Sequence, residues 1–237
     1  MICVTSISPT HINKDIQLQA VKSWQDLGIN VYSFNSPKEV EILKPLYPSV
    51  TFVETTRTME LTYGKPYVQI NAILDFCQLL REDYFCIINS DIELKTDKQT
   101  IDRIKIEMEK GIVLSNRVNY DVDYNGAQYM AGIDTFFIHK KWMAMYAQTT
   151  FCFGQCFWDY WIPYVALMNN IPVTFIKQNV TFHKNHHAQY NADQWKKTGR
   201  YFIWEHNLYQ FNPITDIGKM STYVFNYIYS TAKRIEI

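Results

Sequence analysis

Short apolar runs alternate with longer stretches of helical spacing along the first half of the chain. The short runs predict buried strands, and they cover residues 2–7, 29–34, 50–53, 84–88 and 112–114. Between them, apolar residues recur at helical spacing, which predicts amphipathic helices at 13–27, 66–80 and 97–110. Strands that alternate with helices indicate crossover connections, so we expect an α/β fold with an open, mainly parallel sheet flanked by helices.

The pattern is less regular after about residue 115. Strands are expected at 133–138 and 173–176, a helix at 158–168 that Pro163 shortens or kinks, and a tyrosine-rich helix at 217–232. No repeat or Gly/Ser-rich linker divides the 237 residues. We therefore expect a single domain over 1–237.

Composition narrows the class of protein. Hydrophobic residues make up 47% of the chain and charged residues only 19%, which excludes a disordered or fibrous protein. The 23 Lys and Arg balance the 23 Asp and Glu, and this argues against a surface that binds nucleic acid or anionic lipid throughout. Five cysteines in apolar surroundings indicate reduced thiols, and no apolar run approaches the roughly 20 residues of a membrane span. A cytoplasmic location is expected.

Asp91 is the most informative single residue. It follows the most apolar of the predicted strands, 84–88, together with Asn89 and Ser90. In open α/β sheets ligands bind beyond the carboxyl ends of the strands, where these side chains should lie. A hard divalent cation takes few carboxylates and completes its shell with phosphate and water, and a nucleotide diphosphate supplies the phosphate. The alternative is that Asp91 only caps the turn after the strand.

Residues 65–74 (KPYVQINAIL) and 83–91 (DYFCIINSD) resemble the core of the GT-A nucleotide-sugar glycosyltransferases. In that family a helix with an asparagine, here Asn71, precedes a strand that ends in the Asp-x-Asp metal motif. Asn89 stands at the position of the first acid, which leaves Asp91 as the principal ligand. Residues 132–138, 158–161 and 183–187 resemble later segments of the family in the same order, so the resemblance covers about 2–187.

The resemblance implies a GT-A fold with a nucleotide-binding half over about 1–115 and an acceptor half over about 116–195. A C-terminal helical extension would follow over about 196–237. Donor-binding residues would be Thr5, Ser6, Asn71, Asn89, Ser90 and Asp91. The cofactor would be Mn²⁺ or Mg²⁺, held by Asp91 and one histidine among His183, His186 and His187. His183 is preferred because it directly follows the strand-like residues 179–182.

Sugar or acceptor contacts would come from Asp134, through hydrogen bonds to sugar hydroxyls, and from the flat rings of Trp158 and Trp161, which suit the faces of sugar rings. Asp159 would be the general base that takes the proton of the acceptor hydroxyl in an inverting transfer. Two other interpretations remain open. Asp134 could cap a turn at the start of a strand, and residues 158–161 could be a capped helix with core aromatics.

Positive charges gather between residues 177 and 200. They are Lys177, Lys184, Lys196, Lys197 and Arg200, against Asp193 alone. Such a segment could close over a diphosphate, bind a polyanionic acceptor, or be the solvated face of a helix.

Together these patterns predict a metal-dependent glycosyltransferase that moves a sugar from a nucleotide diphosphate sugar to a hydroxyl of a glycan or small molecule. One alternative is a transferase that acts on a hydroxylated base of DNA, although zero net charge counts against it. Another is a non-catalytic GT-A-like domain that binds a nucleotide or a partner, since Asn89 replaces an acid. A glycoside hydrolase would also use paired carboxylates but fits the strand–helix alternation less well.

Overall fold

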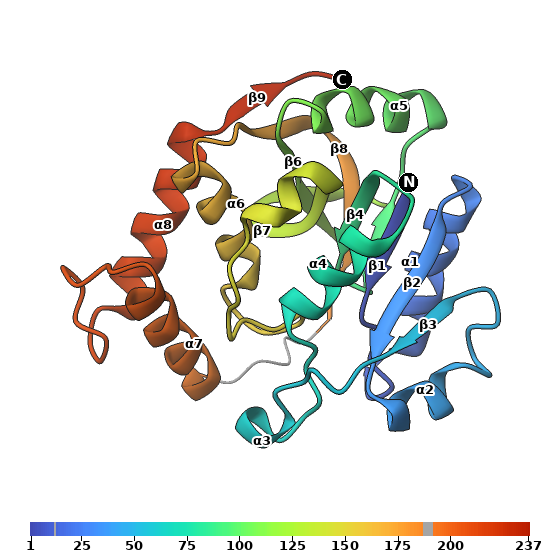
Figure 1. Cartoon of the computed structure of the whole chain (residues 1–237). Coiled ribbons are helices and arrows are strands. Elements are labelled where there is room, and N and C mark those ends of the chain that lie inside the picture. Colours follow the sequence, from blue (N-terminus) through green and yellow to red (C-terminus); the bar gives the residue numbers. More distant parts are fainter. Residues whose placement is uncertain (12, 187–191) are drawn as a thin grey trace.

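The computed structural model describes residues 1–11, 13–186 and 192–237, and within them the chain alternates strands and helices (Figure 1). The strands are β1 (Ile2–Thr5), β2 (Asn30–Asn35), β3 (Thr51–Glu54), β4 (Tyr84–Ile88), β5 (Ile92–Leu94), β6 (Ile112–Tyr120), β7 (Gly126–His139), β8 (Val173–Lys184) and β9 (Lys233–Ile235). The helices are α1 (Lys14–Asp26), α2 (Pro37–Leu43), α3 (Glu60–Tyr63), α4 (Ile70–Leu79), α5 (Lys98–Met108), the 3₁₀ helix η1 (Lys140–Met145), α6 (Trp158–Met168), α7 (Ala192–Glu205) and α8 (Ile217–Thr231).

All the strands of the described residues join one sheet in the order β3-β2-β1-β4-β7-β6-β8-β5, with β9 beside β8. The first four strands in this order are parallel, as are the pairs β6–β8 and β8–β9. Strand β7 runs antiparallel to both β4 and β6, and β5 is antiparallel to β8. The expectation of a mainly parallel sheet flanked by helices is confirmed.

Residues 89–91 force this sheet to curl. They are the only link between β4 and β5, yet β7, β6 and β8 lie between these two strands in the sheet. Four strand spacings across a flat sheet would measure about 19 Å. The four-residue step from Ile88 to Ile92 reaches at most about 14 Å. The path β4-β7-β6-β8-β5 therefore bends back on itself, and residues 89–91 close the gap.

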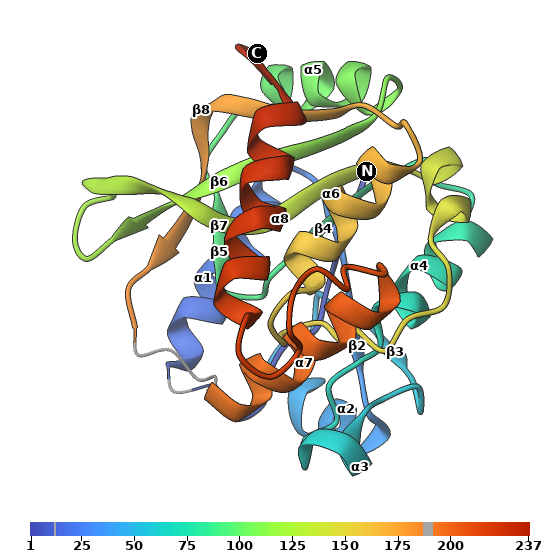
Figure 2. The same cartoon turned by 90° about the vertical axis from the view of Figure 1, so that its left-hand side faces the viewer.

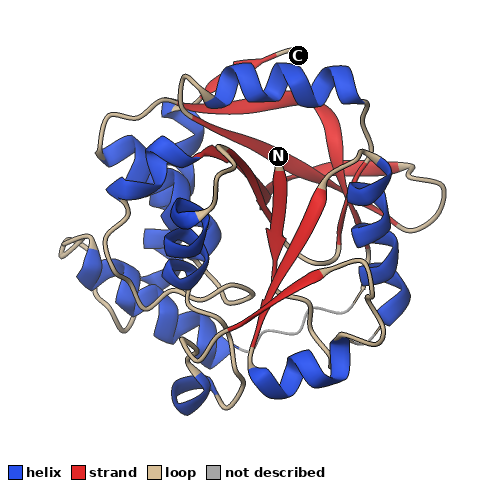
Figure 3. Ribbon diagram, turned by 45° about the vertical axis from the view of Figure 1, so that its right-hand side comes forward, coloured by secondary structure: helices blue, strands red, loops and turns tan. Residues whose placement is uncertain are grey.

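Alternating side chains of the strands feed two hydrophobic cores. In β4, Phe85 and Ile87 pack on the core that contains α4, α6, α7 and α8, whereas Cys86 and Ile88 pack on the core that contains α1, α2 and α5. Helices consequently cover both sides of the sheet (Figure 3). Figure 2 shows α6, α7 and α8 together on one of these sides, with the β6–β7 hairpin projecting beyond them. Burial on both faces explains why the strands of the first half read as unbroken apolar runs.

The structure reproduces the expected bounds closely in some elements and extends others. The strand at 84–88 and the helix at 158–168 match, and Pro163 lies inside α6 without ending it. The strands expected at 112–114, 133–138 and 173–176 are the buried cores of the much longer β6, β7 and β8. The basic segment 177–200 belongs to two elements, since it is part of β8 up to Lys184 and part of α7 from Ala192.

Candidate active site

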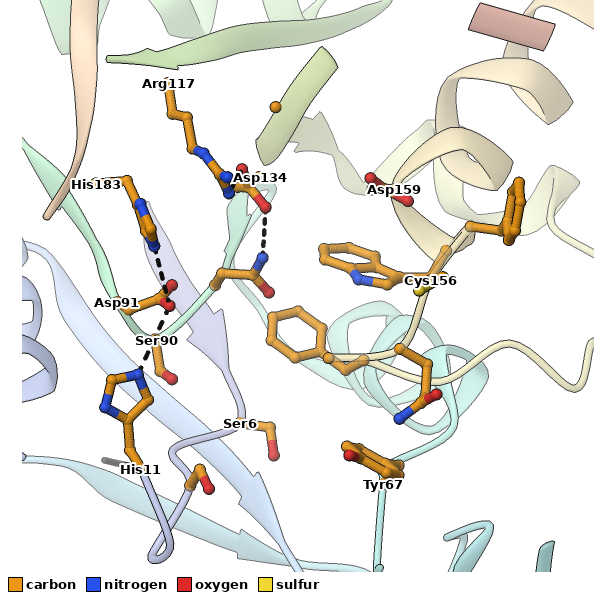
Figure 4. A pocket seen from close by; sticks show the side chains of 18 of the residues that line it. Ser6, His11, Tyr67, Ser90, Asp91, Arg117, Asp134, Cys156, Asp159 and His183 are labelled. Carbon is orange, nitrogen blue, oxygen red and sulfur yellow. Dashed lines mark hydrogen bonds and ion pairs between the residues drawn. The ribbon is translucent and has the colours of Figure 1, made fainter. Parts of the chain in front are cut away.

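A cavity of about 580 Å³ opens at the carboxyl ends of β1 and β4 (Figure 4). The loops after these strands form one wall, and the start of α6 forms the opposite wall. The predicted site residues that line it are Ser6, Asn89, Ser90, Asp91, Asp134, Trp158, Asp159 and His183. These residues are far apart in the sequence, so the fold brings them together.

Three predicted site residues lie outside the lining. Thr5 is fully buried behind the cavity wall. The amide of Asn71 supports the loop after η1, because its Nδ2 donates to the carbonyl of Ala147 (2.9 Å) and its Oδ1 accepts from the amide of Thr149 (2.7 Å). Trp161 points into the core and donates from Nε1 to Glu205 (2.6 Å). Asn71 and Trp161 thus have structural roles, and Thr5 is part of the buried sheet.

Asp91 lies among three histidines. Its Oδ2 is 3.1 Å from Nε2 of His186, 3.5 Å from Nε2 of His183 and 3.8 Å from Nε2 of His11. Burial alone would raise the pKa of Asp91, but its interactions with His11, His183 and His186 outweigh burial and hold it well below its usual range. Asp91 is therefore a carboxylate, and it points into the cavity between His11 and His183 (Figure 4). His187, the third histidine of the sequence motif, lies outside the described residues.

His11 was not predicted as a site residue from the sequence. Its position in the structure depends on the hydrogen bonds of Gln17. In the orientation that satisfies its neighbours, the Gln17 amide bonds both backbone groups of Ser8 (2.9 and 3.0 Å) and accepts from Oγ of Ser90 (2.7 Å). This fully buried side chain ties the loop after β1 to the loop after β4. Asn13 then begins α1 by accepting from the amide of Asp15 (3.1 Å), which fixes the far end of the His11 loop.

Asp134 is held from two sides at the centre of the cavity. Its Oδ1 accepts from Nδ2 of Asn89 (2.7 Å) and its Oδ2 from the guanidinium of Arg117 (2.7 Å). Burial would lower the pKa of Arg117, but the charges of Asp134 and Asp91 reverse this and raise it. Arg117 therefore stays a cation between two carboxylates, and Asp134 keeps lone pairs free to accept from a ligand hydroxyl.

Asp159 begins α6 on the opposite side of the cavity from Asp91 (Figure 4). Burial and then the charge of Asp134 raise the pKa of Asp159 to about 7, against opposing contributions from backbone amides and Arg117. Trp158 lies beside it at the cavity wall, but its ring packs on Phe136 and Phe153 and is only 2% exposed. Tyr160, which the sequence places beside Asp159 as a further flat face for a sugar ring, lines the cavity, and so does Tyr67, which was not predicted as a binding residue.

A second, shallower cavity of about 400 Å³ follows one face of α7. Its lining residues are Asp193, Lys196, Lys197, Arg200, Tyr201 and Trp204. Three of the five basic residues expected between 177 and 200, Lys196, Lys197 and Arg200, thus share one helix face with two aromatic rings, whereas Lys177 and Lys184 belong to β8. Among the described residues, no helix is long and apolar enough to cross a membrane.

Comparisons with known proteins place this geometry in a fold. No family model and no curated protein matches the sequence. The structure of residues 1–349 of S. aureus TarS, a glycosyltransferase, superposes with a TM-score of 0.51 at 11% identity, covering 86% of this chain and 64% of TarS 1–349. A longer TarS structure gives 0.53 at 10% identity, covering 98% of this chain and 43% of that one. The chain has a GT-A-like fold. It spans less than two thirds of either TarS chain.

A weaker likeness links the GT-A-like chain to HddC from Yersinia pseudotuberculosis, complexed with GMP-PN. The TM-score is 0.43 at 14% identity, and the alignment covers 83% of this chain and 97% of HddC. A likeness at this TM-score supports no argument about this chain, and the reaction has to be argued from the site itself.

Proposed function

We propose that the protein is a glycosyltransferase that moves a sugar from a nucleotide diphosphate sugar to a hydroxyl of a glycan or small molecule, using a divalent cation. One observation carries this proposal. A single cavity at the ligand-binding edge of a GT-A-like sheet holds a carboxylate with imidazoles on one side and a half-buried carboxyl group with a raised pKa on the other.

The donor belongs on the side of β1 and β4. Ser6 and Ser90 line the cavity there and offer hydroxyl groups to a nucleotide, while Asp91 and His183 would hold the cation, Mn²⁺ or Mg²⁺ by the family resemblance. Carboxylate and imidazole are competent ligands for such ions. When bound, the cation neutralises the charge that develops on the leaving diphosphate.

The acceptor belongs on the side of α6. Asp159 would take the proton from the acceptor hydroxyl at its carboxylate oxygen, and a pKa of about 7 suits a base that works near neutral pH. Asp134, fixed by Asn89 and Arg117, would accept hydrogen bonds from sugar hydroxyls between the two sides. The aromatic residues around Asp159 exclude water that would otherwise hydrolyse the donor.

The identity of the acceptor has one alternative with specific support. The cationic and aromatic face of α7, which includes Lys196, Arg200 and Trp204, suits an anionic acceptor such as DNA that carries a hydroxylated base. Adding short DNA with such bases to the assay below tests it. Transfer to DNA that disappears in a Lys196→Glu, Arg200→Glu variant would favour this acceptor over a neutral glycan.

The test of the reaction class is release of nucleoside diphosphate from a panel of nucleotide sugars, measured with Mn²⁺ and with Mg²⁺. The wild-type protein should release diphosphate slowly from one donor and faster with its acceptor. Asp159→Asn should keep donor affinity and lower turnover by about 10²–10⁴-fold, the range for loss of a general acid or base. Asp102→Asn, on the exposed face of α5, is the matched control and should leave turnover unchanged.

Thermal stability separates a transferase from a non-catalytic binding domain. A nucleotide at 100 times its dissociation constant should raise the unfolding free energy by about 2.7 kcal/mol. Stabilisation without any diphosphate release would support the binding domain. Absence of stabilisation by every nucleotide tested, with and without metal, would overturn both.

A further inference from the structure

We infer that His11, Asp91, His183 and His186 form a resident site for a nitrogen-preferring transition metal ion of the Zn²⁺ and Co²⁺ class, which binds before any nucleotide arrives. His11, from the loop after β1, supplies the ligand that the acid missing at position 89 does not. This inference rests on the proposed function for the use of the ion, and it replaces the Mn²⁺ or Mg²⁺ that the family resemblance implies with an ion of this class. Binding itself is a property of these four side chains and can be measured without any donor.

Three of the four side chains converge on one point. His11, Asp91 and His186 each offer a ligand atom, and these three atoms lie within 4.8 Å of one another. His183 lies beside this group, with its Nε2 3.5 Å from Oδ2 of Asp91 and 3.1 Å from Nε2 of His186, and would complete the ligand set. Four ligands of a tetrahedral ion with bonds of about 2.0–2.1 Å lie about 3.3 Å apart. The separations between Oδ2 of Asp91 and the three imidazoles, 3.1 to 3.8 Å, bracket that value.

His11 is oriented as a metal ligand rather than as a hydrogen-bond partner. Its side chain is 8% exposed, and its Nε2 is buried without a hydrogen-bond partner while facing Asp91. Its Nδ1 lies 2.8 Å from the carbonyl oxygen of Asn13, a shorter contact than the 3.2 Å to the Asn13 amide. Because a carbonyl can only accept, the tautomer that donates from Nδ1 to it has its lone pair on Nε2, the nitrogen that faces Asp91. A backbone carbonyl that fixes the tautomer is the usual support of a ligating histidine.

The composition of the ligand set decides the class of ion. Three imidazoles and one carboxylate suit Zn²⁺, Co²⁺ or Ni²⁺, whereas Mg²⁺ prefers oxygen ligands and retains several waters. Asn89 offers at most a neutral amide oxygen in place of an acid, because its amide nitrogen donates to Asp134. The natural affinity order of divalent ions at such a site places Mg²⁺ last and Mn²⁺ below Co²⁺ and Zn²⁺.

The backbone holds these ligands in place without a nucleotide. His183 is paired in register with Ile92 of β5 and with Asn119 of β6, so its position relative to Asp91 is set by the sheet. His11 is held between the Gln17–Ser8 contacts and the Asn13 cap of α1. An ion with three or four protein ligands needs no phosphate to stay bound, which distinguishes a resident ion from one that arrives with the donor.

The experiment titrates tag-free, metal-stripped protein with Co²⁺, Zn²⁺, Mn²⁺ and Mg²⁺ in the absence of nucleotide, by calorimetry and by the visible absorption of bound Co²⁺. One Co²⁺ should bind per chain with the spectrum of an imidazole-rich site, and Mg²⁺ should bind at least tenfold more weakly. His11→Ala and His186→Ala should each weaken Co²⁺ binding by at least about tenfold, the lower bound for loss of even an outer-shell partner. His139→Ala, a histidine of β7 paired with Glu109, is the matched control and should bind Co²⁺ as the wild type does.

Wild-type affinity for Co²⁺ in folded His11→Ala protein would remove His11 from the site. Mg²⁺ binding as tight as Co²⁺, or Co²⁺ binding that requires a nucleotide, would overturn the inference without any variant. Diphosphate release in a separate assay keeps the two proposals distinct. If the protein binds Co²⁺ through His11 but releases no diphosphate from any donor, the metal site is supported and the proposed function is contradicted. If it releases diphosphate but does not bind Co²⁺ through His11, the proposed function is supported and the metal site is contradicted.

Discussion

Asn89 donates a hydrogen bond of 2.7 Å from its Nδ2 to Oδ1 of Asp134. The GT-A family resemblance expects an acid at position 89, and this contact shows why the chain has an amide. A carboxylate at 89 would place two negative groups within hydrogen-bond distance of each other, beside the guanidinium of Arg117. Asp134, rather than residue 89, therefore provides the carboxylate beside Arg117 in this cavity.

Restoring the acid should destabilise the protein. In Asn89→Asp the hydrogen bond to Asp134 is replaced by repulsion between like charges, so we expect the free energy of unfolding to fall by about 1–3 kcal/mol. Thermal or urea unfolding measures the change. Asn89→Ala, which loses the hydrogen bond without adding a charge, should lose less. Equal stability of Asn89→Asp and the wild type would contradict the account of position 89.

Activity should depend on pH through Asp159. Only the deprotonated carboxylate accepts a proton, and its pKa is about 7 because burial and the charge of Asp134 raise it. For the productive donor and acceptor, kcat/KM should therefore rise tenfold per pH unit below 7 and level off above it. A profile that is flat from pH 5 to 8 would remove Asp159 as the base.

The same raised pKa links stability to pH. The folded protein favours the neutral form of Asp159. The resulting contribution to the unfolding free energy is fully present below the ordinary pKa of aspartate, near 3.9, and is lost as the pH rises through the folded-state pKa of about 7. Asp159→Asn cannot ionise and avoids this loss. Relative to the wild type, its unfolding free energy should gain up to about 4 kcal/mol between pH 4 and pH 8. If the difference in unfolding free energy between Asp159→Asn and the wild type does not change over this range, ionisation of Asp159 does not destabilise the folded protein.

Trp161 should matter for folding and not for donor binding. Trp161→Phe loses the hydrogen bond to Glu205 and part of a buried ring, so we expect a loss of about 1–3 kcal/mol in unfolding free energy. The stabilisation that nucleotide adds should remain as in the wild type. A selective loss of nucleotide or acceptor affinity in a stable Trp161→Phe protein would contradict this prediction and show that the ring contributes to ligand binding.

Cys156 should react slowly although it lines the cavity. Burial and the nearby charge of Asp159 raise the pKa of its thiol to about 12, which lowers the thiolate fraction at neutral pH by roughly 10³-fold relative to an ordinary cysteine. Labelling with iodoacetamide at pH 7.5, followed by mass spectrometry, measures the rate. Cys156→Ser identifies the labelled site, and modification of Cys156 at the rate of free cysteine would contradict the prediction.

The sequence predicted the parallel half of the fold because that half is buried on both faces. Runs such as 84–88 are apolar throughout, and both hydrophobic cores need them. The outer part of β6 was not predicted because the polar residues Asn116, Arg117 and Asn119 interrupt its apolar pattern, and Arg117 lines the cavity. In the outer part of β8 only residues 179–182 were recognised as strand-like, and His183 beyond them lines the cavity. Apolar periodicity cannot detect a strand whose side chains serve a site.

The candidate site was partly predictable for a similar reason. Asp91 stands out because it directly follows the end of a buried strand, and Asp159 because aromatic residues surround it in the sequence. His11 lies in a polar loop, and only the contacts of Gln17 with Ser8 and Ser90 bring it to Asp91. Asn71 and Trp161 were placed in the site because helical spacing does not say which side of a helix faces a cavity.

The short link between β4 and β5 restricts how this protein can change. Surface loops elsewhere tolerate added or lost residues, but residues 89–91 span a gap whose width is set by four neighbouring strands. An insertion there would move Asp91 away from His183 or open the curl of the sheet, and a deletion would pull β5 off β8. Homologous sequences should therefore vary in loop length around the cavity but keep three residues between the positions of Ile88 and Ile92.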